Sequence, residues 1–539
     1  MKKTKNVWTN CVFAVLMLMA SITFFVHAEV VLPTVIGSNM VVQQGEPVHL
    51  WGWADAGEKI TIKQSGAVVA TTEGAGRVTP WSVKLAAPKP GAVADIDVIG
   101  TNTIAITNIL AGDVWLCTGQ SNMVMTLKKG PWCGYGGVVD EEKEIAAATD
   151  GEIRFYLGGG GNDKPLRESK SGWVVCSPEN APRFSAVGYF FARKLRSEIK
   201  VPIGVMAMAA GGRPAEWFAP SKVMDGDADF QTQRKAGLAL KEELKEKMLA
   251  DRKANGEYHK LLDVARKKGE KAPPKPADHV TPEEAAKVSK YEPYVDFGFL
   301  WDRDIHPVAA FPVRGFVWYQ GESNATRGDK YAVLMTKLIQ GWRDAWGKPL
   351  PFIMVALAGF QNGEASPSVM TVKGDSYPLV REAMVKVSET VADVGVVSAV
   401  DVGEEKNIHP HNKKPVGERA AMWALSHVYK KEVVGDGPKV GLVEYAVGKA
   451  IVKFTEHADG LVLKSAGGFQ LAGADKKFYP AKAELKGKTI EVTAPEVAVL
   501  VALRYDFLNY PESTVYNGAG IPALPFRTDD WAIDKPIAP

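Results

Sequence analysis

Short runs of nearly continuous apolar residues recur through the middle of the 539-residue chain, and each ends in a polar or glycine-rich turn. They occupy residues 113–116, 202–208, 315–319 and 351–357, with helix-like segments between them at 186–198, 331–346 and 415–430. Such runs between helices are typical of the buried strands of a parallel sheet. Because ligands bind at the carboxyl ends of the strands in open sheets, functional residues are expected there. The sequence therefore predicts an α/β domain.

The segments on either side of this region have a different, strand-rich texture. Apolar or alternating runs at 48–53, 59–63 and 104–106 lie between Gly, Pro and Ala turns, and a similar pattern returns at 450–454, 461–463 and 499–504. Such patterns indicate short β-strands. We predict an N-terminal β-sandwich region at 29–108, the α/β domain at 109–433 and a C-terminal β-rich region at 434–539. The two β-rich regions could pack against each other.

A segment rich in Lys, Glu and Ala interrupts the α/β domain at about 228–289, with a Pro-rich centre at 272–276. This composition is typical of a solvated helical hairpin, whose charges form an exposed face. A lid over the active site is the alternative.

The first residues have the features of a secretory signal peptide. Lys2, Lys3 and Lys5 precede an apolar run at 11–26 and a plausible cleavage site after Ala28. We predict that residues 1–28 are removed and that the protein is exported, either periplasmic or secreted, with no membrane span left after cleavage. A retained signal anchor is the alternative. Cleavage removes three lysines, so the net charge falls from +3 to 0 (3 − 3), which gives nucleic acid no electrostatic attraction.

Neither the remaining cysteines nor any nucleotide-binding motif in the sequence indicates a cofactor. Cys117, Cys133 and Cys176 have no zinc-site spacing. Cys117 is expected in the core, and a Cys133 to Cys176 disulfide is left open. The chain has no dinucleotide glycine fingerprint, P-loop or His-Glu-x-x-His motif, so no cofactor and no metal are expected.

The turn after the first apolar run carries a serine. The run that begins at Asp113 stops at Gly-Gln-Ser, which places the Ser121 hydroxyl at the edge of the predicted sheet. A serine nucleophile needs a base and donors for the developing oxyanion. Residue types for these roles occur in the segments 316–324 and 407–413, the second of which contains two histidines. A helix N-cap is the alternative role for Ser121.

These segments resemble the conserved blocks of the SGNH hydrolases, and within them those of the sialate O-acetylesterase family. The blocks are Gly119-Gln-Ser-Asn-Met123, Trp318-Tyr-Gln-Gly-Glu-Ser-Asn324 and Ile408-His-Pro410 followed by Asn412-Lys413. The resemblance extends from Leu32-Pro33 to the segment 520–529. It implies an SGNH-type parallel sheet domain with flanking β-rich regions.

The resemblance also implies catalytic roles. Ser121 is the expected nucleophile, and His409 is the expected base, with His411 as the less favoured choice. The expected oxyanion donors are the backbone of Ser121, the backbone of Gly211 or Gly212 after another strand, and the side-chain amide of Asn324.

The acidic member of a catalytic triad is not where the family pattern places it. Many relatives have an acid immediately before Ile-His-Pro, where this chain has Asn407, and the general SGNH spacing falls on Lys406. Asp401, Glu404 and Glu405 lie nearby, and we rank Glu404 and Asp401 first. The alternative is a Ser-His dyad, in which no carboxylate fixes the imidazole tautomer.

A rim that binds sugar hydroxyls is expected near the nucleophile. Its candidate residues are Gln120, Arg213, Glu216, Gln320 and Glu322. Trp217 could be an aromatic platform for a sugar ring or a core residue. Relatives commonly have Thr where Arg213 stands, and the added cation suggests an anionic substrate.

The sequence as a whole predicts an exported carbohydrate O-acetylesterase, a carboxylic ester hydrolase whose partner is an O-acetylated sialic acid or another glycan. A deacetylase of xylan, pectin or sulfated polysaccharide is one alternative. The other is a non-catalytic glycan-binding protein on a degenerate hydrolase scaffold.

Overall fold

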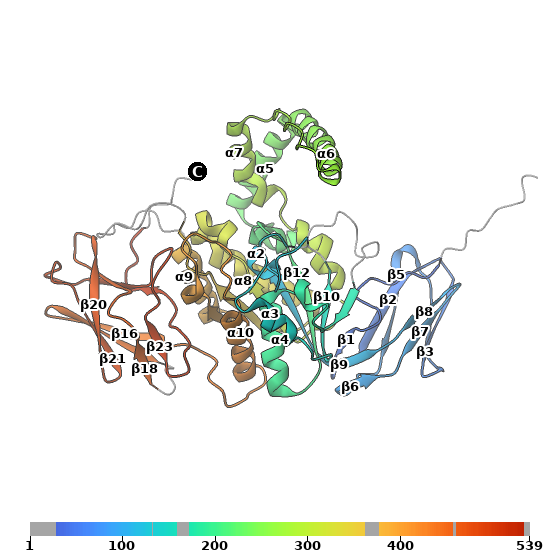
Figure 1. Cartoon of the computed structure of the whole chain (residues 1–539), viewed down its shortest axis with the longest axis horizontal. Coiled ribbons are helices and arrows are strands. Elements are labelled where there is room, and N and C mark those ends of the chain that lie inside the picture. Colours follow the sequence, from blue (N-terminus) through green and yellow to red (C-terminus); the bar gives the residue numbers. More distant parts are fainter. Residues whose placement is uncertain (1–28, 132, 159–171, 362–376, 456–459, 533–539) are drawn as a thin grey trace, which may run out of the picture.

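The computed structural model describes residues 29–131, 133–158, 172–361, 377–455 and 460–532. The predicted signal peptide, residues 1–28, lies outside the described residues. Across the described ranges, no helix combines the length and apolar character needed to cross a membrane. Figure 1 shows an α/β centre with a β-rich region at each end and a group of helices standing above it.

A largely parallel sheet forms the centre of the described structure. Seven of its strands run in the order β11-β10-β12-β9-β13-β14-β15, in which only β11 is antiparallel to its neighbour, and β1 and β6 also pair with β9. The strands are β1 (Val41–Gln43), β6 (Gly91–Val93), β9 (Ile109–Gly119), β10 (Ile153–Leu157), β11 (Gly172–Val175), β12 (Ile203–Ala209), β13 (Gly315–Tyr319), β14 (Phe352–Ala356) and β15 (Val394–Ser398).

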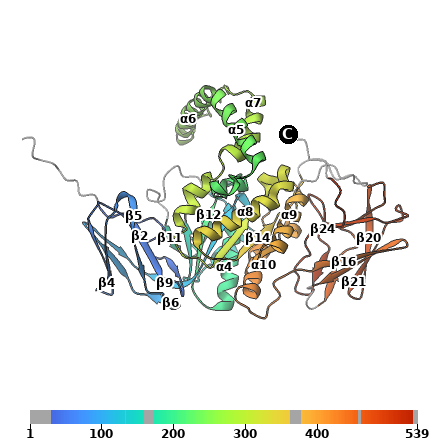
Figure 2. The ribbon, with the colours of Figure 1, turned by 180° about the vertical axis from the view of Figure 1, so that it is seen from behind.

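The apolar runs in the sequence form these strands because both faces of the sheet are covered. Every residue of β9, β13 and β14 is buried. Two helix pairs, α4 with α10 and α8 with α9, pack on the sheet (Figures 1 and 2). The predicted α/β fold class is confirmed. The helices of this part are α2 (Ser121–Val124), α3 (Glu141–Ala146), α4 (Ala186–Ile199), α8 (Gly328–Trp346), α9 (Tyr377–Thr390) and α10 (Lys414–His427).

Short helical turns connect these elements. They are η1 (Ala181–Arg183), η2 (Ala215–Phe218), η3 (Ser221–Met224), the π-helical η4 (Trp301–Ile305), η5 (His306–Val308), η6 (Glu322–Arg327) and η7 (Val400–Val402).

The N-terminal β-rich region shares one hydrophobic core with the α/β domain. Its strands form a β2-β5 pair and a sheet in the order β4-β3-β7-β8. They are β2 (Val48–Ala54), β3 (Lys59–Gln64), β4 (Ala67–Glu73), β5 (Gly76–Leu85), β7 (Ile96–Ile99) and β8 (Thr103–Ile106). The predicted boundary at residue 108 falls directly before β9.

The C-terminal β-rich region has a core of its own. Its strands are β16 (Lys439–Ala446), β17 (Lys449–Thr455), β18 (Leu461–Leu463), β19 (Phe469–Ala472), β20 (Phe478–Lys486), β21 (Thr489–Thr493), β22 (Ala502–Tyr505), β23 (Val515–Asn517) and β24 (Phe526–Arg527). The idea that the two β-rich regions pack together is wrong, because they lie at opposite ends of the α/β domain in both views (Figures 1 and 2).

The charged segment forms three helices on the side of the sheet where its parallel strands end. They are α5 (Ala228–Glu243), α6 (Lys245–Lys268) and α7 (Pro282–Val295), and they stand above α2 in Figure 1. α5 packs against α7, and the Pro-rich stretch lies between α6 and α7. We call these three helices the helical insertion. The single residue of α6 that is buried is Ala265, which agrees with a solvated surface.

Candidate active site

Three strands end side by side at the edge of the sheet that carries the predicted site. Gly119, the last residue of β9, pairs with Ala209 at the end of β12 and with Tyr319 at the end of β13. The turns that follow therefore begin at the same level. They carry Ser121, the pair Gly211 and Gly212, and the block that ends at Asn324.

Ser121 occupies the first position of α2, directly after a sharp turn. Gly119 has a φ of +135°, and a Cβ atom there would lie 2.1 Å from the carbonyl oxygen of Tyr319. A larger residue would therefore push the turn away from β13. Ser121 is 8% exposed. Gln120, and not Ser121, holds the N-cap position, and its side chain makes no capping hydrogen bond to α2, so the N-cap alternative for Ser121 does not apply.

The loop after β12 lies against Ser121. A Cβ atom on Gly211 would be 3.6 Å from Ser121 Cβ and 3.1 Å from Tyr135 Oη. Gly212 follows with a φ of +67°. Within the described part of the chain, the backbone N–H groups of Ser121, Gly211 and Gly212 donate to no protein acceptor. These groups could bind an oxyanion formed next to the Ser121 hydroxyl.

His409 lies between β15 and α10, and Tyr135 joins it to this loop. The two rings stack with their centroids 4.2 Å apart and their planes 16° apart. Tyr135 Oη also approaches Gly211, so this tyrosine connects the His409 ring to the loop that lies against Ser121. Burial, followed by the positive charge of Lys413, lowers the pKa of His409 from 6.5 to about 4. The ring is therefore neutral at physiological pH and can accept a proton.

A hydrogen bond also joins the loops that carry the serine and the histidine. Asn122, which follows Ser121, donates from Nδ2 to the carbonyl oxygen of Ile408 at 3.0 Å. Ile408 directly precedes His409. The loops that carry Ser121 and His409 therefore contact each other, although the two residues are 288 positions apart in the chain (409 − 121).

The two carboxylates that we considered for the triad contact other groups. Asp401 forms a bidentate ion pair with Arg419, at 2.6 and 2.7 Å, and accepts a bond from Tyr516. Glu404 Oε1 lies 2.9 Å from His411 Nδ1 and accepts the His411 N–H at 2.7 Å. Among the described residues, neither carboxylate is bonded to the His409 ring.

Glu404 acts on His409 through Asn407 instead. Asn407 Nδ2 donates to Glu404 Oε2 at 2.8 Å and to the His409 carbonyl oxygen at 3.0 Å, while Asn407 Oδ1 accepts the His409 N–H at 3.0 Å. Burial alone would raise the pKa of Glu404, but the bonds from His411 and Asn407 outweigh it and lower the pKa. The asparagine at the family's acidic position therefore holds the backbone of the histidine.

Asn324, the predicted side-chain oxyanion donor, is buried and bonded. Its Oδ1 accepts from the Ala215 N–H and from Gln320 Nε2, at 2.9 and 2.7 Å. Its Nδ2 donates to Glu216 Oε2 at 2.8 Å, and Arg327 contacts the other oxygen of Glu216. One N–H of the amide is thus used, and Glu216 is a buried partner of Asn324 rather than part of an exposed rim.

Three other residues of the predicted rim also face inward. Gln120 Oε1 accepts backbone N–H groups of the block that follows β13, at 3.2 and 3.3 Å. Gln320 is fully buried and accepts the Tyr331 hydroxyl at 2.8 Å. Glu322 accepts from Asn122 at 2.6 Å, and burial raises its pKa. These side chains hold the loops together instead of lining an open surface.

Arg213 is the predicted rim residue that reaches solvent, with 42% of its side chain exposed. Its guanidinium lies 4.4 Å from the ring centre of the buried Trp217. Its Nη1 is 3.2 Å from Glu292 of α7. Arg213 therefore connects the loop beside Ser121 to the helical insertion.

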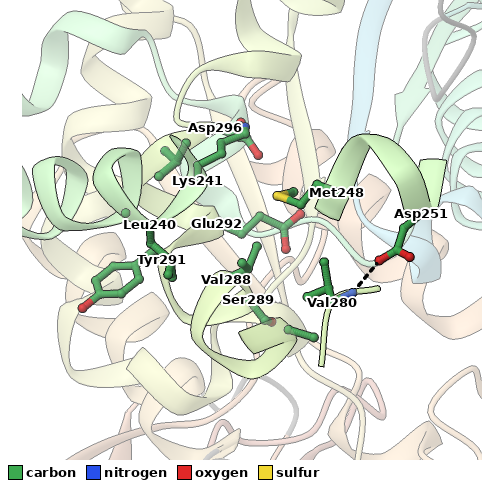
Figure 3. A pocket seen from close by; sticks show the side chains of 13 residues that line it. Leu240, Lys241, Met248, Asp251, Val280, Val288, Ser289, Tyr291, Glu292 and Asp296 are labelled. Atoms are coloured by element: carbon green, nitrogen blue, oxygen red, sulfur yellow. Dashed lines mark hydrogen bonds and ion pairs between the residues drawn. The ribbon is translucent and has the colours of Figure 1, made fainter. Parts of the chain in front are cut away.

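The helical insertion has a cavity of its own, of about 410 Å³. Figure 3 shows Leu240, Met248 and Val288 around it, together with the bond from Val280 to Asp251. Glu292, the partner of Arg213, also faces this space (Figure 3). None of the predicted catalytic residues lines this cavity.

The three cysteines of the described residues are free thiols. Cys117, Cys133 and Cys176 are buried, and none is in a disulfide, so the bridge left open by the sequence is not formed. Across the described ranges, no group of three His, Cys, Asp or Glu residues is placed to hold a metal ion.

Reasoning from the sequence missed three residues of the site. Asn122 and Lys413 were visible within the family blocks, but nothing in the pattern assigned them a role. Tyr135 lies in a loop with no motif, and only its stacking on His409 identifies it.

Comparisons with known proteins find carbohydrate esterases. Residues 300–426 match the family model described as carbohydrate esterase, sialic acid-specific acetylesterase. This segment includes the turn after β13 and the loop with His409. The chain is 24% identical to the sialate O-acetylesterase of Rattus norvegicus over 77% of each chain, and 24% identical to that of Homo sapiens over 91% of each chain.

A solved structure extends the similarity to the complete architecture. The crystal structure of a carbohydrate acetylesterase from Xanthomonas citri matches 93% of this chain and 100% of its own, with a TM-score of 0.72 and 28% identity. The alternative of a non-catalytic glycan-binding protein is not favoured by these relatives. Together, the family model, the curated relatives and the solved structure support a sialate O-acetylesterase family for this chain, which is a carboxylic ester hydrolase.

Proposed function

We propose that this enzyme removes O-acetyl groups from carbohydrates, with Ser121 as nucleophile and His409 as base. The observation that carries this proposal is the arrangement around Tyr135. Its ring stacks on His409, and its hydroxyl approaches Gly211, which lies against Ser121. Tyr135 thus links the neutral imidazole to the loop with free N–H groups that lies against the proposed nucleophile.

The proposed reaction has two steps. Ser121 Oγ attacks the acetyl carbonyl carbon while His409 takes the hydroxyl proton, and the oxyanion is bound by the N–H groups of Ser121, Gly211 and Gly212. The intermediate then expels the sugar oxygen, which receives the proton from His409. In the second step, water gives a proton to His409 and attacks the acetyl-enzyme. The bond from the acetyl carbon to Ser121 Oγ then breaks, Ser121 Oγ receives the proton from His409, and acetate leaves.

We propose that His409 works without a directly bound carboxylate. Tyr135 fixes one face of the ring, and Asn407, held by Glu404, fixes the backbone on which the ring stands. A carboxylate normally sets the tautomer and stabilises the imidazolium. We therefore expect a reaction slower than that of a complete triad.

For the substrate, we propose an O-acetylated sugar that carries an acidic group, such as a sialic acid. The exposed guanidinium of Arg213 beside the oxyanion loop can bind a carboxylate in two-point fashion. The change Arg213→Gln should lower kcat/KM on acidic acetylated sugars more than on neutral ones. Arg303→Gln is the matched control, because Arg303 also stacks on an aromatic ring, that of Phe299. Equal effects of Arg213→Gln on both substrate classes would favour a neutral glycan such as xylan.

We also propose that the protein is exported after removal of residues 1–28. N-terminal sequencing of the mature protein should begin at Glu29. Recovery of the full-length chain in a membrane fraction would instead indicate a retained anchor.

The test of catalysis is acetate release from a small acetyl ester and from O-acetylated sugars. Ser121→Ala and His409→Ala should each lower kcat by several orders of magnitude. His411→Ala tests the less favoured base, and Ser197→Ala, which alters an exposed hydroxyl of α4, is the control for serine replacement. Activity that survives Ser121→Ala would reject the mechanism.

A further inference from the structure

We propose that Asn122 is a positioning residue that fixes the distance between Ser121 and His409, and that the buried Lys413 and the half-buried Glu322 hold it in one orientation. The inference rests on the proposed function, because it assigns a role relative to that nucleophile and base.

The carboxamide of Asn122 makes three hydrogen bonds, and the residue is 1% exposed. Oδ1 accepts from Lys413 Nζ at 2.7 Å. Nδ2 donates to Glu322 Oε1 at 2.6 Å and to the Ile408 carbonyl oxygen at 3.0 Å. A rotated amide would turn its oxygen toward these two acceptors and its NH₂ group toward the Lys413 ammonium. The contacts therefore allow a single orientation.

The amide joins loops that follow three different strands. Asn122 belongs to the turn after β9, Glu322 to the turn after β13, and Ile408 and Lys413 to the loop between β15 and α10. Asn122 is next to Ser121 in the chain, and Ile408 is next to His409. A shift of this amide therefore changes the position of the nucleophile relative to the base. A misplacement of about 1 Å can lower a rate by about 100-fold.

The burial of Lys413 argues against a purely structural role. Lys413 is 1% exposed, and burial lowers its pKa from 10.5 to about 7. No direct ion pair joins Lys413 to Glu322 within the described part of the chain; both side chains are bonded to Asn122 instead. Packed apolar residues of similar volume are often as stable as buried charges, or more stable. Because such a buried group adds little stability of its own, its contact with Oδ1 of Asn122 supports an orienting role.

The first experiment compares Asn122→Ala with a matched control, Asn517→Ala. Asn517 in β23 is equally buried and makes two hydrogen bonds, to the Asp436 carbonyl oxygen and from the Ile521 N–H, each at 2.9 Å. Both variants should lose stability in urea unfolding. Asn122→Ala should lower kcat on a small acetyl ester by about 100-fold and change KM by less than about twofold. Asn517→Ala should leave kcat unchanged.

Two further variants give readouts that loss of stability would not move. Asn122→Asp keeps the size and the Lys413 contact but places an oxygen against Glu322 and the Ile408 carbonyl, so kcat should fall as in Asn122→Ala. Lys413→Met should also lower kcat, and it should move the acidic limb of the kcat/KM profile to higher pH, because the cation beside His409 is gone.

The outcomes separate this inference from the proposed function. If Ser121→Ala is inactive while Asn122→Ala and Asn122→Asp keep wild-type kcat, the positioning role is wrong and the proposed mechanism stands. If Ser121→Ala is active, both fail. Should Asn122→Ala not fold, Asn122→Asp decides the question.

Discussion

The dependence of activity on pH follows from the environment of His409. A base works only when neutral, so kcat/KM falls as pH drops through the pKa of the free enzyme's histidine. Burial against Tyr135 and the charge of Lys413 place that pKa at about 4. At pH 5, about 90% of His409 is then neutral, against about 3% for a histidine with the ordinary pKa of about 6.5. The fraction of enzyme with a neutral base at pH 5 should therefore be roughly 30-fold larger than with an unperturbed histidine.

The assay is kcat/KM on a neutral acetyl ester from pH 3.5 to 8, with the folded fraction followed by circular dichroism. Tyr135→Ala exposes one face of the imidazole to water. The acidic limb of this variant's kcat/KM profile should therefore move to higher pH, toward about pH 6.5. Tyr135→Phe keeps the ring and should keep the wild-type limb. A wild-type limb near pH 6.5, or identical limbs in Tyr135→Ala and wild type, would refute the claim that burial by Tyr135 keeps His409 neutral.

Three more predictions concern stability. Gly119→Ala should lower the free energy of unfolding by about 3 kcal/mol or more, because its Cβ would meet the Tyr319 carbonyl oxygen at a positive φ; Gly134→Ala, with open space around it, should be near neutral in the same urea titration. Asp401→Asn should lower the free energy of unfolding by about 3–5 kcal/mol, because it leaves the buried Arg419 unpaired, and kcat of the folded enzyme should not change. A fall in kcat without loss of stability would restore Asp401 to the triad. Between about pH 7 and 10.5, the unfolded chain holds a proton on Lys413 that the folded chain has lost, so wild-type stability should rise with pH relative to Lys413→Met; parallel stability curves would contradict this.

The strands of the central sheet could be predicted because their signal is local. A strand covered on both faces must be apolar along its length, and β9, β13 and β14 are. The Gly-Gln-Ser turn was equally visible, because a chain that leaves a buried strand beside another backbone needs a glycine such as Gly119.

The partners of the polar side chains could not be predicted in the same way. Glu404 is closer in sequence to His409 than to His411, yet it contacts His411 and reaches His409 only through Asn407. Gln320 and Glu322 have the residue types of a sugar-binding rim, but the packing of three loops turns them inward.

The sequence by itself determined the α/β architecture, the helical character of the insertion, and the serine and histidine proposed for catalysis. These features depend on residue periodicity, on turn chemistry and on short blocks similar to those of a known family. The tertiary structure alone decided that Tyr135 covers His409, that Asn122 bonds both Lys413 and Glu322, and that the two β-rich regions lie apart. Such contacts join segments hundreds of residues apart, and hydrogen bonds form only within about 3.5 Å, a distance that the folded backbone sets and local sequence does not.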